Sequence, residues 1–200
     1  MGRNQRRTDM KTIQYLSVYL IVAVCSLTTS AADYDIDPAH TSIAFKVKHL
    51  GISTVTGRFD KFSGTVSLDG KDLKTLKTSA TIEAASVNTG VEKRDAHLRN
   101  ADFFDTAKFP QLTFVSKEVK DIAGDKCKLV GDLTMHGVTK SVTLEGEFGG
   151  TSSAFGAPRI GFSASTTVKR SEFGITGGNA GAVIGEDIKI TLEIEAVAKK

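Results

Sequence analysis

The chain contains few of the residues and motifs that covalent or metal chemistry requires. It has only two cysteines, Cys25 and Cys127. Because Cys25 lies in an N-terminal segment that we expect to be removed, no internal disulfide can form and the core must stabilise the fold unaided. Cys127 has no second cysteine with which to bind zinc, and no pair among the four histidines has the spacing of His-Glu-x-x-His.

Sequence motifs of nucleophilic catalysis and of nucleotide binding are also absent. The chain contains no Gly-x-Ser-x-Gly motif and no Gly-rich phosphate loop that ends in Lys-Ser or Lys-Thr. The glycines of the stretch 177–181 follow no strand–helix pattern, so we interpret them as a loop. We therefore predict no catalytic residue, no metal and no cofactor.

The first 32 residues have the features of a secretory signal peptide. Basic residues up to Lys11 precede a mostly apolar run at 13–27, and small residues follow at 30–32. The apolar run is shorter than the roughly 20 residues of a spanning helix, which favours a signal over a membrane anchor. We expect cleavage after Ala32, a periplasmic location and one domain over residues 33–200. The sequence does not decide between Met1 and Met10 as the start.

Removal of this leader also removes the net positive charge. The full chain has 26 Lys and Arg against 23 Asp and Glu, of which the leader holds four basic residues and one acidic residue. The mature chain keeps 22 of each and is nearly neutral. A nucleic-acid partner, which would need a basic surface, is therefore not expected.

Most of the mature chain alternates apolar with polar residues, the pattern of strands that bury one face. Turn signals containing glycine recur at roughly 8–12-residue intervals, as in an all-β sandwich or barrel. The pattern predicts about eight strands, the number typical of a small closed up-and-down barrel. Their predicted ranges are Ser42–His49, Val55–Leu68, Thr75–Ala84, Gln111–Lys120, Lys126–Met135, Val138–Phe148, Arg159–Val168 and Asp187–Ala196.

One segment, residues 92–105, lacks this alternation and predicts one or two helical turns that cross the barrel. On such a helix Asp95 and Arg99, four residues apart, are placed to form an ion pair. Charged residues gather here, and two interpretations apply: they bind a ligand's anionic or carbonyl head group at the mouth of a pocket, or they clamp the segment to the barrel. We favour the clamp, and both interpretations extend to Arg170.

Small residues share the inward parity of the apolar rows: Gly64, Ala80, Ala84, Gly131 and Ala164. They either leave an open channel along the barrel axis or make room for bulky neighbours in a filled core. If a channel is present, Ala80→Phe and Gly131→Leu should fill it without straining the fold. Cys127 shares the same parity, so we predict a buried and unreactive thiol. The glycine-rich stretch 174–185 is expected to form a mobile rim.

Taken in order along the chain, several short motifs make it resemble the YceI-like family of secreted bacterial polyisoprenoid-binding proteins. Each motif alone is weak, and the order makes the resemblance specific. Tyr34 stands where many members have Trp. The motifs lie at Asp35–Ile43, Phe45–Leu50, Gly57–Gly64, Ser86–Arg99, Asp102–Phe104, Phe109-Pro110, Gly131–Lys140 and Arg170–Ile175.

The resemblance implies a lipocalin-like antiparallel barrel whose apolar tunnel holds an isoprenoid chain, such as the tail of a quinone or a polyprenyl phosphate. It also suggests a homodimer and a transient contact with a membrane or a membrane electron-transfer protein. The expected tunnel lining is Phe45, Val47, Phe62, Ala80, Ile82, Leu133, Met135, Leu144, Phe162 and Ile190. The residues expected to bind the head group or to form the clamp are His40, Arg94, Asp95, His97, Arg99 and Arg170.

Two other functions remain open on the sequence. The barrel could hold a lipid on which it acts as an enzyme, in which case the residues between Arg94 and Arg99 and His40 would carry the chemistry. Alternatively, the barrel is filled with its own side chains and serves as a stress-response interaction module. The sequence does not identify the lipid, its head group, its delivery partner or its physiological role.

Overall fold

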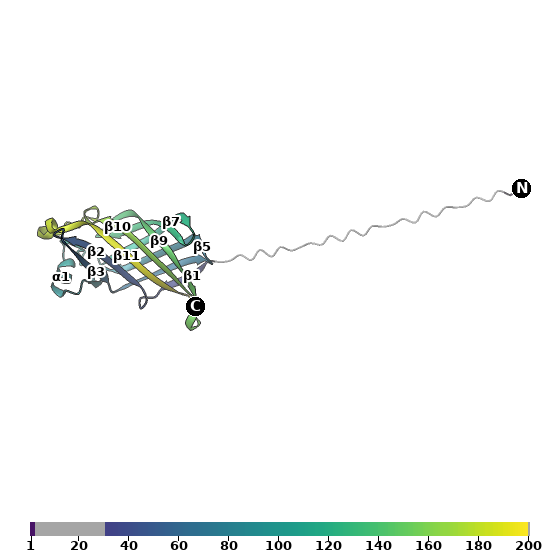
Figure 1. Ribbon diagram of the computed structural model, residues 1–200, viewed down its shortest axis with the longest axis horizontal. Helices are drawn as coiled ribbons and strands as arrows, with labels where there is room; N and C mark the ends of the chain where they lie inside the picture. Colours follow the sequence, from purple (N-terminus) through teal and green to yellow (C-terminus); the bar gives the residue numbers. More distant parts are fainter. Residues whose placement is uncertain (3–30, 200) are drawn as a thin grey trace.

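The computed structural model describes residues 1–2 and 31–199, where eleven strands form one antiparallel sheet that closes on itself (Figure 1). The predicted leader, residues 1–32, lies outside the described residues except at its two ends. The strands are β1 (Ala32–Ile36), β2 (Ser42–His49), β3 (Ser53–Phe59), β4 (Phe62–Asp69), β5 (Asp72–Glu83), β6 (Val87–Asn88), β7 (Gln111–Ala123), β8 (Lys126–Met135), β9 (Val138–Ser152), β10 (Arg159–Lys169) and β11 (Ile184–Ala198).

Around the barrel the strands count as eight, because three pairs of strands each act as one interrupted strand. β1 and β2 pair successively with the end and the middle of β11, while β4 and β3 pair with β1 and β2 in turn. β5 and β6 likewise follow one another along β4 and β3. Each strand then pairs with the next, and β11 closes the ring. The predicted up-and-down barrel of eight strands is confirmed.

The prediction of one continuous strand over Val55–Leu68 is wrong in detail, because β3 ends at Phe59 and β4 begins at Phe62. Asp60 leaves the strand ladder: its N–H donates to the carbonyl of Ser86 at 3.1 Å. Its carboxylate accepts hydrogen bonds from the side chains of Arg58 and Asn88, both at 2.6 Å. These contacts kink the strand and draw β6 against β3.

The helical prediction for residues 92–105 is confirmed by α1 (Glu92–Leu98), which lies at one end of the barrel in the connection from β6 to β7. The predicted ion pair between Asp95 and Arg99 does not form. Asp95 accepts hydrogen bonds from the N–H and hydroxyl of Thr89 at 2.8 and 2.5 Å. Arg99 instead donates to the carbonyl of Ala85 at 2.9 Å. No helix among the described residues combines the length and apolarity of a membrane-spanning helix.

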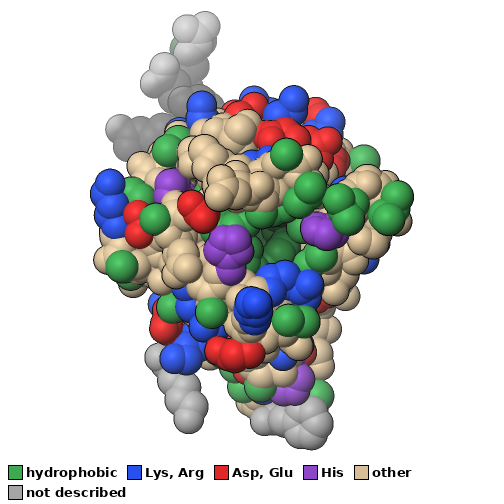
Figure 2. Space-filling model, turned by 90° about the vertical axis from the view of Figure 1, so that its left-hand side faces the viewer, with side chains coloured by type: hydrophobic (Ala, Val, Ile, Leu, Met, Phe, Trp, Pro, Cys, Tyr) green, Lys and Arg blue, Asp and Glu red, His purple; other side chains and the backbone are tan. Residues whose placement is uncertain are grey.

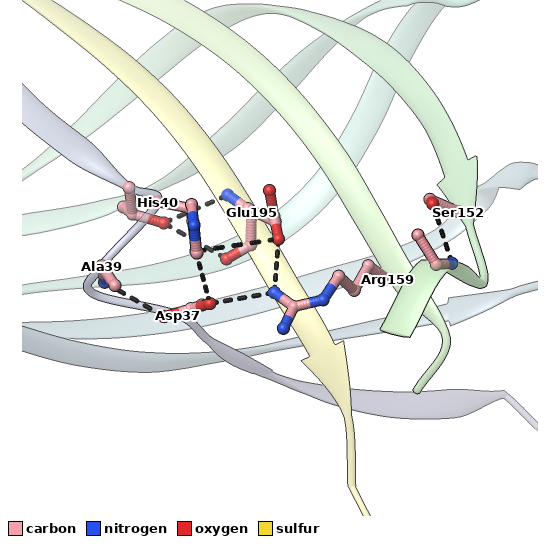
Figure 3. Close-up of polar contacts among 8 residues, drawn as sticks. Asp37, Ala39, His40, Ser152, Arg159 and Glu195 are labelled. Atoms are coloured by element: carbon pink, nitrogen blue, oxygen red, sulfur yellow. Dashed lines mark hydrogen bonds and ion pairs between the residues drawn. The ribbon is translucent and has the colours of Figure 1, made fainter. Parts of the chain in front are cut away.

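A polar cluster on the outer wall ties together the gap between β1 and β2, the start of β10 and the end of β11 (Figure 3). Arg159 donates to the carboxylates of Asp37, at 2.9 Å, and Glu195. His40 contacts Asp37 at 2.8 Å, and the N–H of Ala39 donates to Asp37 at 3.0 Å. Ligand atoms of Asp37, His40 and Glu195 lie within 4.8 Å of one another, but the Arg159 guanidinium already supplies the positive charge there.

Hydrogen bonds from His40, Arg159 and the Ala39 N–H lower the pKa of Asp37 from 3.8 to about 2. A carboxylate with a depressed pKa stabilises the fold above its unfolded-state pKa, and that contribution is lost as pH falls through the folded-state value. We expect the stability difference between wild type and Asp37→Asn to shrink as the pH falls from about 5, through 3.8, to about 2. Urea unfolding at a series of pH values measures it.

The matched control for this prediction is Asp35→Asn, which changes an exposed carboxylate on β1. Its stability relative to wild type should vary less over the same pH interval. A difference for Asp37→Asn that stays constant down to pH 2 would contradict the assigned role of the cluster.

Candidate ligand cavity

The barrel encloses a cavity of about 380 Å³ that opens at the end carrying α1. Figure 2 looks into this end and shows hydrophobic side chains lining a hollow, with basic side chains and histidines at its margin. The cavity exists because inward positions of successive strands carry apolar side chains that do not meet across the axis. Its volume lies within the range of small-molecule sites, about 300–1,000 Å³.

Of the ten residues predicted to line a tunnel, nine line this cavity. Phe62 does not: it is half-buried and packs against the core beside the cavity. Whether the nine contact a ligand stays a prediction, since the structure establishes their position only. They are Phe45, Val47, Ala80, Ile82, Leu133, Met135, Leu144, Phe162 and Ile190.

The small inward residues were expected either to leave a channel open or to make room for bulky neighbours, and the structure contains both cases. Ala80 and Ala164 line the cavity, whereas Gly64 and Gly131 make room for neighbours. A Cβ on Gly131 would lie 2.5 Å from the Phe114 ring and 2.6 Å from the carbonyl oxygen of Val115. The expectation that Gly131→Leu would fill empty space is therefore wrong, because Phe114 on β7 already occupies it.

The position that does open into the cavity is Gly146 on β9. A Cβ there would make only ordinary contacts, at 3.6 Å to the Cys127 carbonyl oxygen and 3.7 Å to its Sγ. Cys127, Gly146 and Ala164 are neighbours across β8, β9 and β10 and form a row of small side chains in the wall. The Cys127 thiol is buried, as predicted, and burial raises its pKa.

The charged side chains that line the cavity lie at its mouth. Of the described residues that line it, none is Asp or Glu, and the basic ones are Lys48, His49, Arg94, His97 and Arg170. His97 contacts Asp102 at 3.3 Å and packs edge-on against the Phe103 ring, with 4.9 Å between centroids.

Arg94 lies beside His97 at the mouth and is held by one residue, Thr89. Its Nε donates to the Thr89 hydroxyl at 2.7 Å and its Nη2 to the Thr89 carbonyl at 3.1 Å. Asp95 accepts hydrogen bonds from the same threonine and is only 5% exposed. Thr89 thus orients Arg94 toward the cavity, while the carboxylate of Asp95 is hydrogen-bonded to Thr89 and does not face the cavity.

Arg170 acts as a clamp on the glycine-rich stretch that forms part of the mouth. Its guanidinium donates to the carbonyls of Ile175, Thr176, Gly181, Ile184 and Gly185, at 2.6–3.3 Å. Its side chain is 11% exposed. The glycine-rich stretch 174–185 therefore lies at the mouth, where Ala180, Val183 and Ile184 line the cavity. Its mobility stays a prediction.

The residues expected to act together in the head-group or clamp cluster lie in different places. Arg94, His97 and Arg170 line the mouth. Arg99 lies behind the segment on the carbonyl of Ala85, and His40 belongs to the outer-wall cluster away from the cavity.

Sequence reasoning missed several mouth residues, above all Lys48, His49, Leu98, Phe103 and Phe104. One signal was available: His49 shares the inward parity of Phe45 and Val47 at the end of the same strand. The phenylalanines and Leu98 offered none, because their positions depend on how the α1 segment folds over the barrel.

Comparison with known proteins identifies the family to which this barrel belongs. Residues 34–196 match the model of the YceI-like domain, and the chain belongs to that family. It is 38% identical to the UPF0312 protein VPA0850 of Vibrio parahaemolyticus over 195 residues, which cover 95% of this chain and 100% of the relative.

Solved structures share the fold. A Campylobacter jejuni YCEI protein superposes with a TM-score of 0.69 at 37% identity, covering 76% of this chain and 90% of the other. A polyisoprenoid binding domain from Saccharophagus degradans, implicated in plant cell wall breakdown, superposes with a TM-score of 0.67 and covers 83% and 98%. At 21% identity the second similarity establishes the barrel fold alone.

The Arg170 clamp gives the first prediction for this site. Arg170→Lys keeps the charge but loses the planar set of donors that reaches five carbonyls. Charged hydrogen bonds contribute about 1.5–3 kcal/mol each and buried carbonyls would lose partners, so we expect a loss of at least about 2 kcal/mol in the free energy of unfolding. Amide hydrogen exchange in residues 174–185 should accelerate. Arg58→Lys, at an exposed ion pair, should cost less than about 1 kcal/mol; equal losses would contradict the clamp.

The two glycines give the second prediction. Gly131→Val forces the Phe114 ring aside, and such overpacking costs about 1–3 kcal/mol. Gly146→Val places its methyl groups in the cavity and gains β-propensity, so its stability should change little. Urea unfolding of the ligand-free proteins compares them. Similar destabilisation by both substitutions would show that the barrel is filled at Gly146.

Proposed function

We propose that this protein binds an isoprenoid lipid in the periplasm, with the chain inside the barrel and the head group at the mouth, and carries, stores or sequesters it. The observation that supports this most strongly is the cavity: apolar along its length, open at one end, with its charged groups confined to that end. Such a division suits a molecule with a long apolar tail and one polar terminus.

The dimensions and energetics agree with a lipid tail. A strand of about nine residues spans roughly 30 Å, so the wall is long enough to line an extended chain. Each CH₂ group taken out of water contributes about 0.8 kcal/mol, and a tail of tens of carbons therefore needs few polar contacts. Part of this gain is offset by the ordering of the chain on binding.

The mouth suits a head group that accepts hydrogen bonds or carries negative charge. Arg94, His97, His49 and Lys48 are donors at the margin, and no described acidic side chain lines the cavity. A polyprenyl phosphate meets these groups with charge and an isoprenoid quinone with its carbonyl oxygens. The YceI family and the polyisoprenoid binding domain with the same barrel support an isoprenoid ligand.

Neither alternative function is favoured by a specific observation. An enzyme would need polar groups free to react, but Asp95 and Arg99 are bonded to Thr89 and Ala85, and His40 lies on the outer wall. Arg94 and His97 do reach the mouth, where Arg94 is bonded to Thr89 and His97 contacts Asp102. The Cys127 thiol, whose pKa is raised by burial, is a poor nucleophile. A barrel filled with its own side chains is not what the structure contains.

Organic-solvent extraction of protein purified from its native host, followed by mass spectrometry, tests the proposal. We expect an isoprenoid lipid in the extract, and we expect the emptied protein to take up added quinone or polyprenol. Folded, monodisperse protein that yields no lipid and takes up neither would contradict the proposal. Light scattering on the same sample measures whether the protein is the homodimer that we also propose.

A variant connects ligand binding to the cavity. Ala80→Phe projects a ring into the space that Ala80 lines, so the ligand-free variant should melt close to ligand-free wild type but retain much less lipid. A large fall in melting temperature, or unchanged lipid retention, would contradict the position assigned to Ala80.

A further inference from the structure

The tips around the mouth expose large apolar side chains that the fold does not need. Leu50, Ile52, Val91 and Val183 are 57, 84, 47 and 36% exposed. Leu50 and Ile52 lie in the turn between β2 and β3, Val183 in the glycine-rich stretch and Val91 just before α1. We call these four side chains the mouth rim. In contrast, two turns at the opposite end, Asp69–Asp72 and Gly124–Lys126, carry polar sequences.

The rim elements are hydrogen-bonded to one another. The N–H of Leu50 donates to the carbonyl of Val183 at 2.8 Å, and the N–H of Gly177 donates to the carbonyl of Asp102 at 2.8 Å. These bonds join the β2–β3 turn, the glycine-rich stretch and the α1 segment around the opening. The rim therefore presents its apolar tips together, on the face through which a ligand enters.

Leu50 is also unfavourable for the turn that contains it. Its φ is +53° and that of Gly51 is +72°, the left-handed pair in which hairpins prefer Asn-Gly or Asp-Gly. A leucine in this conformation costs local stability and, at 57% exposure, recovers little of it by packing. Folding gives no reason for leucine at this position, whereas contact with another apolar phase would.

We propose that the mouth rim docks onto an anionic phospholipid bilayer, into which Leu50 and Ile52 insert so that the tail of a lipid passes between membrane and cavity. The proposal rests on the proposed function. Lys48 is exposed next to the tip, and neither it nor the exposed Lys93 forms an ion pair with a described residue. Glu92, which lies between Val91 and Lys93, is 3.9 Å from the guanidinium of Arg99. Exposed lysines near apolar tips suit an anionic lipid surface.

A second copy of the chain fits the rim less well. A stable protein interface buries about 800 Å² on each partner over a continuous, complementary face. The rim instead consists of four side chains from three separate segments, namely the β2–β3 turn, the residue before α1 and the glycine-rich stretch. The headgroup region of a bilayer can adapt to such tips, and a rigid protein surface can do so only if it is shaped to them.

Flotation with phosphatidylcholine vesicles, with and without phosphatidylglycerol, tests the docking. We expect wild type to float with the anionic vesicles and to dissociate as salt is raised. In the double variant Leu50→Asn with Ile52→Thr, vesicle binding should fall at least about tenfold. Leu50→Asn alone should leave the fold as stable or more stable, because Asn suits the turn.

The matched control removes exposed apolar side chains from the barrel wall, through Val115→Thr and Ile122→Thr on β7. It should bind vesicles like wild type. Wild type that fails to float at low salt, or a double variant that floats equally well, would overturn the docking. A double variant that changes the protein from dimer to monomer in light scattering would assign the rim to self-association and also overturn it.

Failure of docking is distinguishable from failure of the proposed function. Neither Leu50 nor Ile52 lines the cavity, so the double variant should bind added polyprenol at equilibrium like wild type while exchanging it with vesicles more slowly. A barrel that binds polyprenol but not vesicles refutes the docking alone. A barrel that binds vesicles but no polyprenol refutes the proposed function.

Discussion

Closure of the sheet by β11 is the constraint on which the rest of the structure depends. β11 pairs with the full length of β10 on one edge and with both β2 and β1 on its other edge. Closure removes free edges and gives the wall a fixed circumference. The residues inside that circumference then determine whether the axis is filled or open. With one buried cysteine in the described chain and no disulfide, the barrel depends on this pairing and on its apolar interior.

One end of the barrel is packed and stabilises the fold, and the other end is open and gives access to the cavity. Away from α1 the interior is solid, and Leu68, Ile160 and Ala196 are at most 1% exposed. At the α1 end, the segment after β6 and the glycine-rich stretch surround an opening, held by the buried Asp95 and by the Arg170 clamp. Polar contacts there fix the backbone of loops that also pack Phe103 and Ile175 into the core, and they leave the cavity wall itself apolar.

Alternation along the chain predicted most of the strands, since a strand that buries one face needs it, but no predicted range includes β1. Ser42–His49 and Lys126–Met135 were predicted with the bounds that the structure has. β6 could not be found, because its two residues form a strand only through their pairing with Arg58 and Phe59. The break at Asp60 was missed although a periodic sign of it exists: the inward apolar residues lie at odd positions up to Phe59 and at even positions from Phe62.

The sequence predicted those site residues whose side-chain direction follows from alternation along one strand. It did not predict features that depend on packing between strands. Nine predicted lining residues face the cavity because inward parity is a local property. Gly131 and Gly146 have the same residue type and parity on neighbouring strands, yet a ring from β7 fills the space at one and not at the other. The bonds of Asp95 to Thr89 and of Arg170 to five carbonyls depend likewise on loop conformations that no short motif specifies.

The electron density inside the barrel, in crystals of protein taken from its own host, tests the central claim most directly. We expect continuous density from the basic mouth at Arg94 and His97 down the cavity past Leu144, with the branching of an isoprenoid chain. A barrel whose interior contains only its own side chains, or ordered water along its length, would contradict a lipid-binding function.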